Sequence, residues 1–520
     1  MANYKNDNNE QGIFLSISLD EQIIPGTIEH AIYDIVENHI DTSVFDDKYK
    51  NDESGRKAYS PKTMIKIILL AYTKGIFKSR RIEEACRRNV QFMAISGNAQ
   101  PDHSTIAAFV SGMQDEVENI FSDILFRCAQ LDLIGGEMFA LDGSKISSNA
   151  SKEWSGTFKE LQRKRDKLSN VIKDLIRRHK ENDLLNNDDF IMKKKKYEEK
   201  IKKIDEFLEE NEPKKGSRSR ELKSNITDNE SAKMKTSHGV IQGYNGLAVV
   251  DDKKQVIVCA EAFGTSGEGK LLSTMIEKSE VQLEAVGLPG GLEDKKFIAD
   301  TGYFSEDNCK YLEEKNIDGY IPDQFFRKRD PRFPDENSRR EKRGLYKQNK
   351  FKYDEKKNYY TCPVGKILRS DGTRNNHGYI GRYYRAGKED CYYCHLKNEC
   401  LQKNAKARSL FIIDIPKPRT YSEMMMNKID TPHGRDMYSK RMGIVEPVFA
   451  NIKTHKGLNG FTLRGKPKVN IQWLLFCCIH NIGKIARKMK GSFDFLLNIF
   501  RFSLFRFQNR EFRILFSISE

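Results

Sequence analysis

The sequence predicts an α/β fold built on a mixed β-sheet, because two short apolar runs end in the same way. Met138–Leu141 stops at Asp142, which is followed by a turn-forming Gly-Ser pair. Far along the chain, Phe297–Ala299 stops at Asp300, which is followed by a Thr-Gly pair. Apolar runs of this length between turn formers are typical of buried strands. A lone aspartate at such a strand end is most often a cap, but burying one is costly unless it is paired or bound to a cation.

The elements around the two aspartates follow the order of a ribonuclease-H-like fold. The strand that ends at Asp142 precedes a predicted β-hairpin (Tyr244–Val250 with Gln255–Ala262) and a helix (Leu271–Glu284). The strand that ends at Asp300 precedes a second helix (Glu306–Lys315) and a short strand (Asp318–Pro322). In that fold the first and fourth strands lie side by side and parallel. Both aspartates would then emerge at the same end of neighbouring strands. Two carboxylates so close at neutral pH require a shared proton or a divalent cation.

The composition indicates a large basic protein with a polyanionic partner. The 520 residues include 89 Lys and Arg against 74 Asp and Glu, and the formal net charge of +15 favours nucleic acid as that partner. No apolar run is long enough to span a membrane, and the polar N-terminus lacks the apolar core of a secretory signal. The ten cysteines do not form a disulfide-type pattern. We therefore expect a reduced, cytosolic protein with no membrane partner.

Residues 18–130 predict a helical N-terminal domain. Apolar residues recur at helical spacing, and Ser60 with Pro61 is a typical helix start. Several short predicted helices carry arginines, namely Arg80, Arg81, Arg87 and Arg88. A DNA-binding module of helix-turn-helix type and a plain helical bundle with a solvated basic face both fit this pattern.

Residues 152–218 predict a charged helical hairpin inserted after the first strand. Two apolar stripes at helical spacing flank a polar turn around residues 186–189 (Phe158, Leu161, Leu168, Ile172 and Leu175; Tyr197, Ile201, Ile204 and Leu208). A solvated hairpin is the simplest interpretation, and contact with DNA or a partner is the alternative.

Residues 325–430 predict a second insertion, which carries four of the ten cysteines (Cys362, Cys391, Cys394 and Cys400). A Cys-x-x-Cys pair with two further cysteines is typical of a tetrahedral structural zinc site, although lone reduced thiols remain the alternative. Tyr383, Tyr384 and Arg385 in the same segment could stack on bases and pair with phosphate.

A third acidic residue, Glu446, lies in the downstream segment 431–490. Lys453 follows seven residues later, so the two side chains would share one face of an α-helix. Pro447 is tolerated in the first turn of a helix but not in its middle, so the helix either begins near Pro447 or kinks there. Asn470–Met489 predicts an apolar core helix. The aromatic and basic tail, residues 491–520, fits a packed helix, a partner-binding segment or a weak DNA contact.

Three stretches together resemble the catalytic motifs of DDE transposases of bacterial insertion sequences. They are LDGSKISSNASK (141–152), FIADTGYFS (297–305) and YSKRMGIVEPVFANIKTHKG (438–457). The nearest branch has a Tyr-Arg-Glu-Lys signature around the glutamate, a helical N-terminal domain and, often, a cysteine-rich insert. The segments 59–109 and 227–251 also resemble this branch. The likeness covers most of residues 20–490 in the family's order.

The resemblance implies a two-metal active site. Mg²⁺, or Mn²⁺ in its place, prefers oxygen ligands, and two such ions can activate a nucleophile and stabilise a leaving oxygen. We expect Asp142 to bridge both ions, and Asp300 and Glu446 each to complete one site.

The same resemblance assigns DNA contacts to three further residues. Lys453 would bind a phosphate at the cut end, Arg441 would do the same, and Tyr438 would stack nearby. The family signature leaves three residues between its Arg and Glu, whereas four separate Arg441 from Glu446 here. The gap of six residues between Glu446 and Lys453 agrees with the signature.

The function implied is that of a DNA transposase, an enzyme that cleaves and joins the ends of its own insertion sequence. Its partners would be terminal inverted repeats and target DNA, with a homodimer or larger assembly in the complex. The alternatives are a related nuclease that cuts without joining and a catalytically dead, transposase-derived DNA-binding protein. We expect a helical domain, a divided catalytic core, a hairpin insertion, a cysteine-bearing insertion, core helices and a tail (18–130; 131–151 with 219–324; 152–218; 325–430; 431–490; 491–520).

Overall fold

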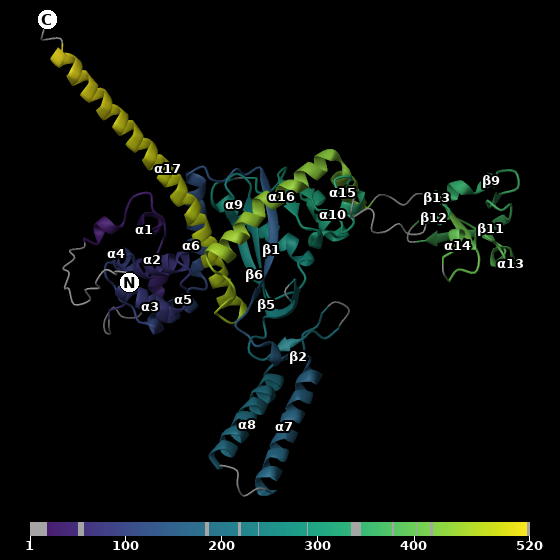
Figure 1. Cartoon of the computed structure of the whole chain (residues 1–520), viewed down its shortest axis with the longest axis horizontal. Helices are drawn as coiled ribbons and strands as arrows, with labels where there is room; N and C mark the ends of the chain where they lie inside the picture. The colour runs from purple at the N-terminus through teal and green to yellow at the C-terminus, as the bar shows by residue number, and fades with distance from the viewer. Residues whose placement is uncertain are drawn as a thin grey trace, which may run out of the picture. The chain divides into compact units, whose positions relative to one another are not determined.

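The computed structural model divides the chain into two compact units (Figure 1). The first unit comprises Met1–Tyr303, Tyr311–Gly319 and Ser439–Glu520, and the second comprises Phe304–Lys310 and Tyr320–Tyr438. The structure describes residues 18–49, 57–181, 187–216, 220–237, 239–288, 290–333, 345–376, 379–402, 404–415 and 420–516.

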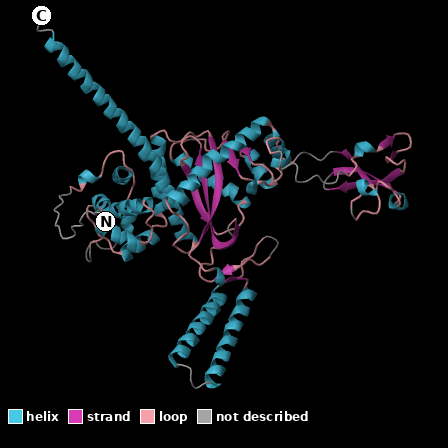
Figure 2. Cartoon of the chain, in the orientation of Figure 1, coloured by secondary structure: helices cyan, strands magenta, loops and turns pink. Residues whose placement is uncertain are grey.

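A six-stranded mixed sheet is the centre of the first unit (Figure 2). Its strands are β1 Met138–Ser147, β4 Ala232–Thr236, β5 Gly239–Asp251, β6 Ile257–Phe263, β7 Lys296–Ala299 and β8 Asp318–Tyr320. The order is β4-β5-β1-β7-β8, with β6 also paired to β5. β5 and β6 form the expected antiparallel hairpin, and β1 pairs with β7 in parallel. The expected neighbouring, parallel arrangement of the first and fourth strands is therefore confirmed.

The N-terminal region is helical, as predicted. It contains α1 Ile28–Asn38, α2 Pro61–Thr73, α3 Ser79–Arg88, α4 Val90–Ser96, α5 His103–Gly112 and α6 Glu116–Gln130. Pro61 occupies the start of α2, where its missing N–H has no partner to lose. All nine residues from Met64 to Tyr72 of α2 are buried, so this helix forms the centre of the helical region.

The long helix α17 Lys466–Phe516 packs on strands β5 and β6. The side chain of Asn481 accepts a hydrogen bond from the backbone N–H of Ile257 (2.9 Å) and donates to its carbonyl (2.8 Å). The indole of Trp473 donates to the carbonyl of Leu247 at 3.0 Å. The Asn481 amide therefore satisfies backbone groups of β6 that no further strand pairs with.

The tail continues α17 as a helix up to Phe516, and residues 517–520 lie outside the described part. No helix in the described ranges is both long and apolar enough to cross a membrane.

Two helices occupy the segment that was expected to form a hairpin, α7 Phe158–Glu181 and α8 Asn187–Glu210. They pack against each other through a small cluster that contains Leu161, Ile204 and Phe207. A two-stranded sheet connects the segment before α7 with the segment after α8 (β2 Ser155–Gly156 and β3 Ser224–Asn225). The expected turn at 186–189 is wrong for residues 187–189, because α8 already begins at Asn187. Residues 182–186 lie outside the described part.

Further helices of the chain are α9 Leu272–Ala285, α10 Glu306–Glu314, α15 Tyr421–Asp430 and α16 Pro432–Ala450. α16 is followed by one π-helical stretch, Asn451–His455.

The second unit contains a separate five-stranded antiparallel sheet in the order β13-β12-β11-β10-β9. Its elements are α11 Phe326–Arg329, β9 Lys352–Asp354, β10 Tyr359–Thr361, β11 Ile367–Asn376, β12 Tyr379–Ala386, α13 Lys388–Tyr392, α14 Lys397–Cys400 and β13 Ser409–Ile415. The cysteine-bearing segment has a small core of its own, in which Tyr384 is 2% exposed. Tyr384 donates a hydrogen bond to Asn358 (2.8 Å). The expectation that Tyr384 stacks on a base is therefore wrong, because its ring is part of this core.

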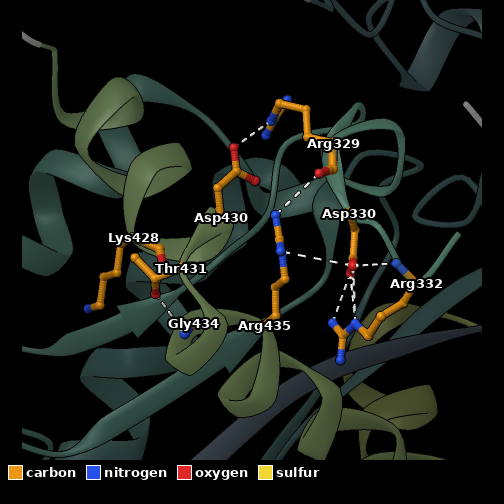
Figure 3. A network of polar contacts seen from close by, with 8 residues as sticks. All are labelled: Arg329, Asp330, Arg332, Lys428, Asp430, Thr431, Gly434 and Arg435. Atoms are coloured by element: carbon orange, nitrogen blue, oxygen red, sulfur yellow. Dashed lines mark hydrogen bonds and ion pairs between the residues drawn. The ribbon is translucent and has the colours of Figure 1, made fainter.

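A network of ion pairs lies elsewhere in the second unit (Figure 3). Asp330 is 1% exposed and receives hydrogen bonds from the guanidinium of Arg332, which hold the pKa of Asp330 below its usual value. Arg435 lies 3.9 Å from the same carboxylate and donates to the carbonyl of Arg329. Arg329 also binds Asp430 at 2.6 Å. Arg332 and Arg435 compensate the buried carboxylate of Asp330, which is a structural role.

Candidate active site

Asp142 and Asp300 lie level with each other at the centre of the first unit. The parallel register pairs Leu141 of β1 with Ala299 of β7, and an aspartate directly follows each. β1 does not end at Asp142 as predicted, since it continues to Ser147 through its pairing with β5. Only the pairing with β7 ends there. The two carboxylates therefore emerge where two parallel neighbours separate.

One cation links the two carboxylates. A guanidinium nitrogen of Arg441, on α16, lies 3.4 Å from Asp142 and 3.5 Å from Asp300. Arg441 is only 11% exposed. The backbone N–H of Gly143 donates to Asp142 (2.8 Å), and that of Thr301 donates to Asp300 (2.6 Å). The carboxylates are thus held in fixed orientations, with an oxygen of each facing the same positive charge.

The electrostatics of Asp142 favour a bound cation. The pKa of Asp142 is raised to about 6, mainly by burial and in smaller part by the charges of Asp300 and Glu268, while Arg441 and the backbone N–H of Gly143 oppose the rise. A buried carboxylate with acidic neighbours is stabilised by any cation that enters the site.

An open cleft of about 970 Å³ exposes both aspartates. Its lining includes residues 142–147 of β1, with Glu268, Asp300 and Lys453. Burial lowers the pKa of Lys453, and the charge of Asp142 opposes this effect. Lys453 therefore stands where a phosphate that enters the cleft would meet a positive charge.

Glu446 is not brought into this group. It is exposed on α16 and is absent from the lining of the cleft, so its role as third ligand stays a prediction. The expectation that Glu446 and Lys453 share a face relied on an uninterrupted α-helix. The chain changes to a π-helix at Asn451, and this wider turn rotates Lys453 relative to α16.

Pro447 lies inside α16, which excludes the first of the two alternatives, a helix that begins near this proline. A proline leaves the carbonyl four residues earlier without its helical partner. Here the side chain of Gln255 donates to that carbonyl, on Gly443, at 2.9 Å. A tertiary hydrogen bond thus replaces the missing helical one.

Tyr438 belongs to the second unit, where its ring packs edge-on against Phe326 at 5.2 Å between centroids. Its proposed stacking on DNA stays a prediction.

Sequence reasoning missed two residues, Glu268 and Asn245. Glu268 lies in a glycine-containing loop before α9 that has no distinctive pattern. Asn245 is fully buried in β5, and a polar residue inside an apolar strand was an available signal.

The donor set fits a divalent cation, since it consists of carboxylates that already face a shared positive charge. Within the described ranges, no group of three or more His, Cys, Asp or Glu side chains is arranged to hold a metal ion as it stands. Around the aspartates, Arg441 occupies the position between the two carboxylates.

The four predicted zinc ligands gather in the second unit. Cys362, Cys391, Cys394 and Cys400 line one small cavity of about 30 Å³. The backbone N–H of Lys366 donates to the sulfur of Cys362 (3.3 Å), and that of Arg408 donates to the sulfur of Cys391 (3.4 Å). Spacing therefore identified residues that do lie together. Like the carboxylates of the described ranges, these four thiols are not arranged to hold a metal ion as they stand.

Comparison with known families found two matches, which cover separate parts of the chain and contain neither Asp142 nor Asp300. Residues 361–486 match the family described as Transposase DDE domain, and residues 18–112 match that described as Transposase domain (DUF772). A search of curated proteins found no match. The chain therefore carries a DDE domain, which defines an enzyme of the polynucleotidyl transferase class and implies a ribonuclease-H-like core. It is a transposase with this DDE domain and an N-terminal DUF772 transposase domain, and a transposase binds DNA.

Proposed function

We propose that this transposase uses Mg²⁺ or Mn²⁺, held by Asp142, Asp300 and Glu446, to cleave and join the ends of its own insertion sequence. The parallel pairing of β1 with β7 carries the proposal, because it places two carboxylates within reach of one cation. Glu446 is supported by its place in the segment that matches the DDE domain. In the same proposal, the chain binds terminal inverted repeats and target DNA as a dimer or larger assembly.

The residues of the cleft would act on the phosphate and on the cations. Divalent ions would activate the attacking oxygen and neutralise charge on the leaving one. Asp142 would hold them most strongly, since it is the more buried carboxylate. Arg441 would have to release the two aspartates when ions enter. Its guanidinium would then be available, with the ammonium of Lys453, to bind DNA phosphate.

The test is Asp142→Asn in the purified full-length protein, with Mg²⁺ and DNA that carries the ends of the element. We expect a loss of strand cleavage of at least about 1,000-fold, because the amide keeps the shape but removes the ligand charge. Binding to end DNA should persist. Asp318→Asn is the matched control, since Asp318 lies in the same sheet and outside the lining of the cleft. Cleavage by Asp142→Asn at the wild-type rate would refute the assignment.

Strand joining distinguishes a transposase from a nuclease that only cuts. Pre-cleaved element ends should be transferred into a target plasmid by the wild-type protein. Cleavage without any transfer would instead support the nuclease.

We also propose that the four clustered cysteines bind a structural zinc ion. The shared cavity supports this, as do the backbone N–H groups that donate to two of the sulfurs. Such hydrogen bonds stabilise thiolate, the form that binds zinc. The ion would draw the sulfurs into the tetrahedral geometry that they lack without it.

A further inference from the structure

The side of the cleft next to Asp142 contains a second carboxylate, that of Glu268. Glu268 is half-buried and lines the same cleft as Asp142 and Asp300. The cleft thus holds three acidic side chains in the first unit without Glu446.

The orientation of Glu268 is fixed by Asn245. The amide nitrogen of Asn245 donates to Glu268 at 2.7 Å. Because a carboxylate only accepts, the NH₂ group of Asn245 must face Glu268, and its carbonyl oxygen must face elsewhere. One oxygen of the Glu268 carboxylate is engaged by this bond.

The side-chain carbonyl oxygen of Asn245 indicates that a ligand is missing from the site. Asn245 is fully buried, yet its carbonyl oxygen has no hydrogen-bond partner. A buried acceptor without a donor is unfavourable, because its lost hydrogen bond to water is not replaced. A Cβ built on Gly143 would lie 3.4 Å from this oxygen and 3.5 Å from the carboxyl carbon of Glu268. The acceptor therefore faces Gly143, the residue directly after Asp142.

The packing around Gly143 is close. The same added Cβ would lie 2.4 Å from a methyl group of Leu247, so a side chain here would displace its neighbours. The glycine thus allows Asn245 and Glu268 to approach the backbone directly after Asp142.

We propose that Glu268 is a further acidic residue of the active site, which binds a divalent cation beside Asp142, and that Asn245 is the residue that positions it. This inference rests on the proposed metal-dependent function. It adds a ligand from the loop before α9, which the three-acid motif does not include.

The experiment is a titration of the full-length protein with Mn²⁺ in the absence of DNA, in which free Mn²⁺ is followed by electron paramagnetic resonance. Glu268→Gln should raise the Kd for Mn²⁺ by at least about tenfold, and Asn245→Ala should raise it in the same direction. Glu284→Gln, at an exposed position near the end of α9, removes the same charge away from the cleft and should leave the Kd unchanged. Melting temperatures in EDTA should stay close to wild type, which separates a metal effect from a folding defect.

Asp142→Asn separates this inference from the proposed function. If Asp142→Asn loses Mn²⁺ binding while Glu268→Gln and Asn245→Ala keep the wild-type Kd, Glu268 is not a ligand and the proposed function stands. If Asp142→Asn also binds Mn²⁺ as wild type does, the proposed metal site fails and this inference fails with it. If Glu268→Gln does not fold, Asn245→Ala decides between these outcomes.

Discussion

The protonation state of the buried His480 follows from its hydrogen-bond partners. It is 2% exposed in α17. One ring nitrogen, Nε2, lies 2.9 Å from the carbonyl of Gln255 and must carry the proton, because a carbonyl only accepts. The other, Nδ1, accepts from the amide of Asn451 at 2.8 Å. Burial lowers the pKa of His480 to about 3, and nearby Lys484 adds to the effect. The folded protein therefore holds a neutral imidazole.

This neutral histidine predicts a loss of stability in mild acid. The unfolded chain takes up a proton below a pH of about 6.5, whereas the folded chain does so only near pH 3, so stability is complete above pH 6.5 and falls as pH drops toward 3. We expect about 2 kcal/mol of this loss between pH 6.5 and pH 5. Urea denaturation at pH 5 and pH 7.5 should show that His480→Gln, which cannot be protonated, loses less than wild type. Equal losses in the two proteins would contradict the assignment.

At the scale of elements, the cysteine-bearing segment folds around a small core of six buried residues. Such a core is marginal without a staple such as a metal ion. The clustering of four cysteines, which spacing predicted, fits this need.

The zinc proposal therefore predicts one zinc ion per purified chain, measured by elemental analysis. Cys391→Ser should lower the zinc content to near zero and expose the segment to limited proteolysis. Cys309→Ser changes a cysteine outside the cavity and should keep the metal. If the wild-type protein is purified without zinc and its cysteine-bearing segment still resists protease, the zinc proposal is refuted and the thiols are ordinary packing groups.

At the scale of the whole molecule, the net charge is +15, but some of the basic side chains are already paired with carboxylates and are less available to bind DNA. On α3, Arg87 and Arg88 are paired with glutamates one turn earlier, at 2.7 Å and 2.9 Å. Arg80 and Arg81 are exposed and make no ion pair with any residue in the described ranges. They also line a hollow of the first unit. The unpaired arginines should carry more of the phosphate binding.

Salt dependence tests this division. The slope of log K against log salt for end-DNA binding should become shallower by about two in the double variant Arg80→Ala/Arg81→Ala, since two phosphate contacts are lost. The double variant Arg87→Ala/Arg88→Ala removes equal charge from the same helix and should change the slope by less. Fluorescence anisotropy between low and moderate salt measures both. Identical slopes would show that α3 does not contact DNA.

Much of the fold followed from local patterns. The pattern depends only on nearby residues in three cases: the apolar runs that end at Asp142 and Asp300, the hairpin of strand formers, and the helical spacing of apolar residues. The structure contains the strands and helices that these patterns predict. The fate of Pro447 could not be predicted, because the hydrogen bond that tolerates it comes from Gln255, almost two hundred residues away. Tyr384 was misjudged for a similar reason, since its burial depends on the folding of a separate small sheet.

The sequence by itself determined the two strand–aspartate units, their order and the cysteine set, because periodicity and spacing are properties of the chain alone. Only the tertiary structure decided which groups share the cleft. It placed Arg441 between the aspartates, brought Lys453 beside them and added Glu268 through Asn245. These neighbours come from four separate elements that lie far apart along the chain. The register of β1 against β7 brings Asp300 level with Asp142, and the packing of helices and loops around the sheet brings in the other side chains. Contacts between such distant segments are not a property of any local stretch of sequence.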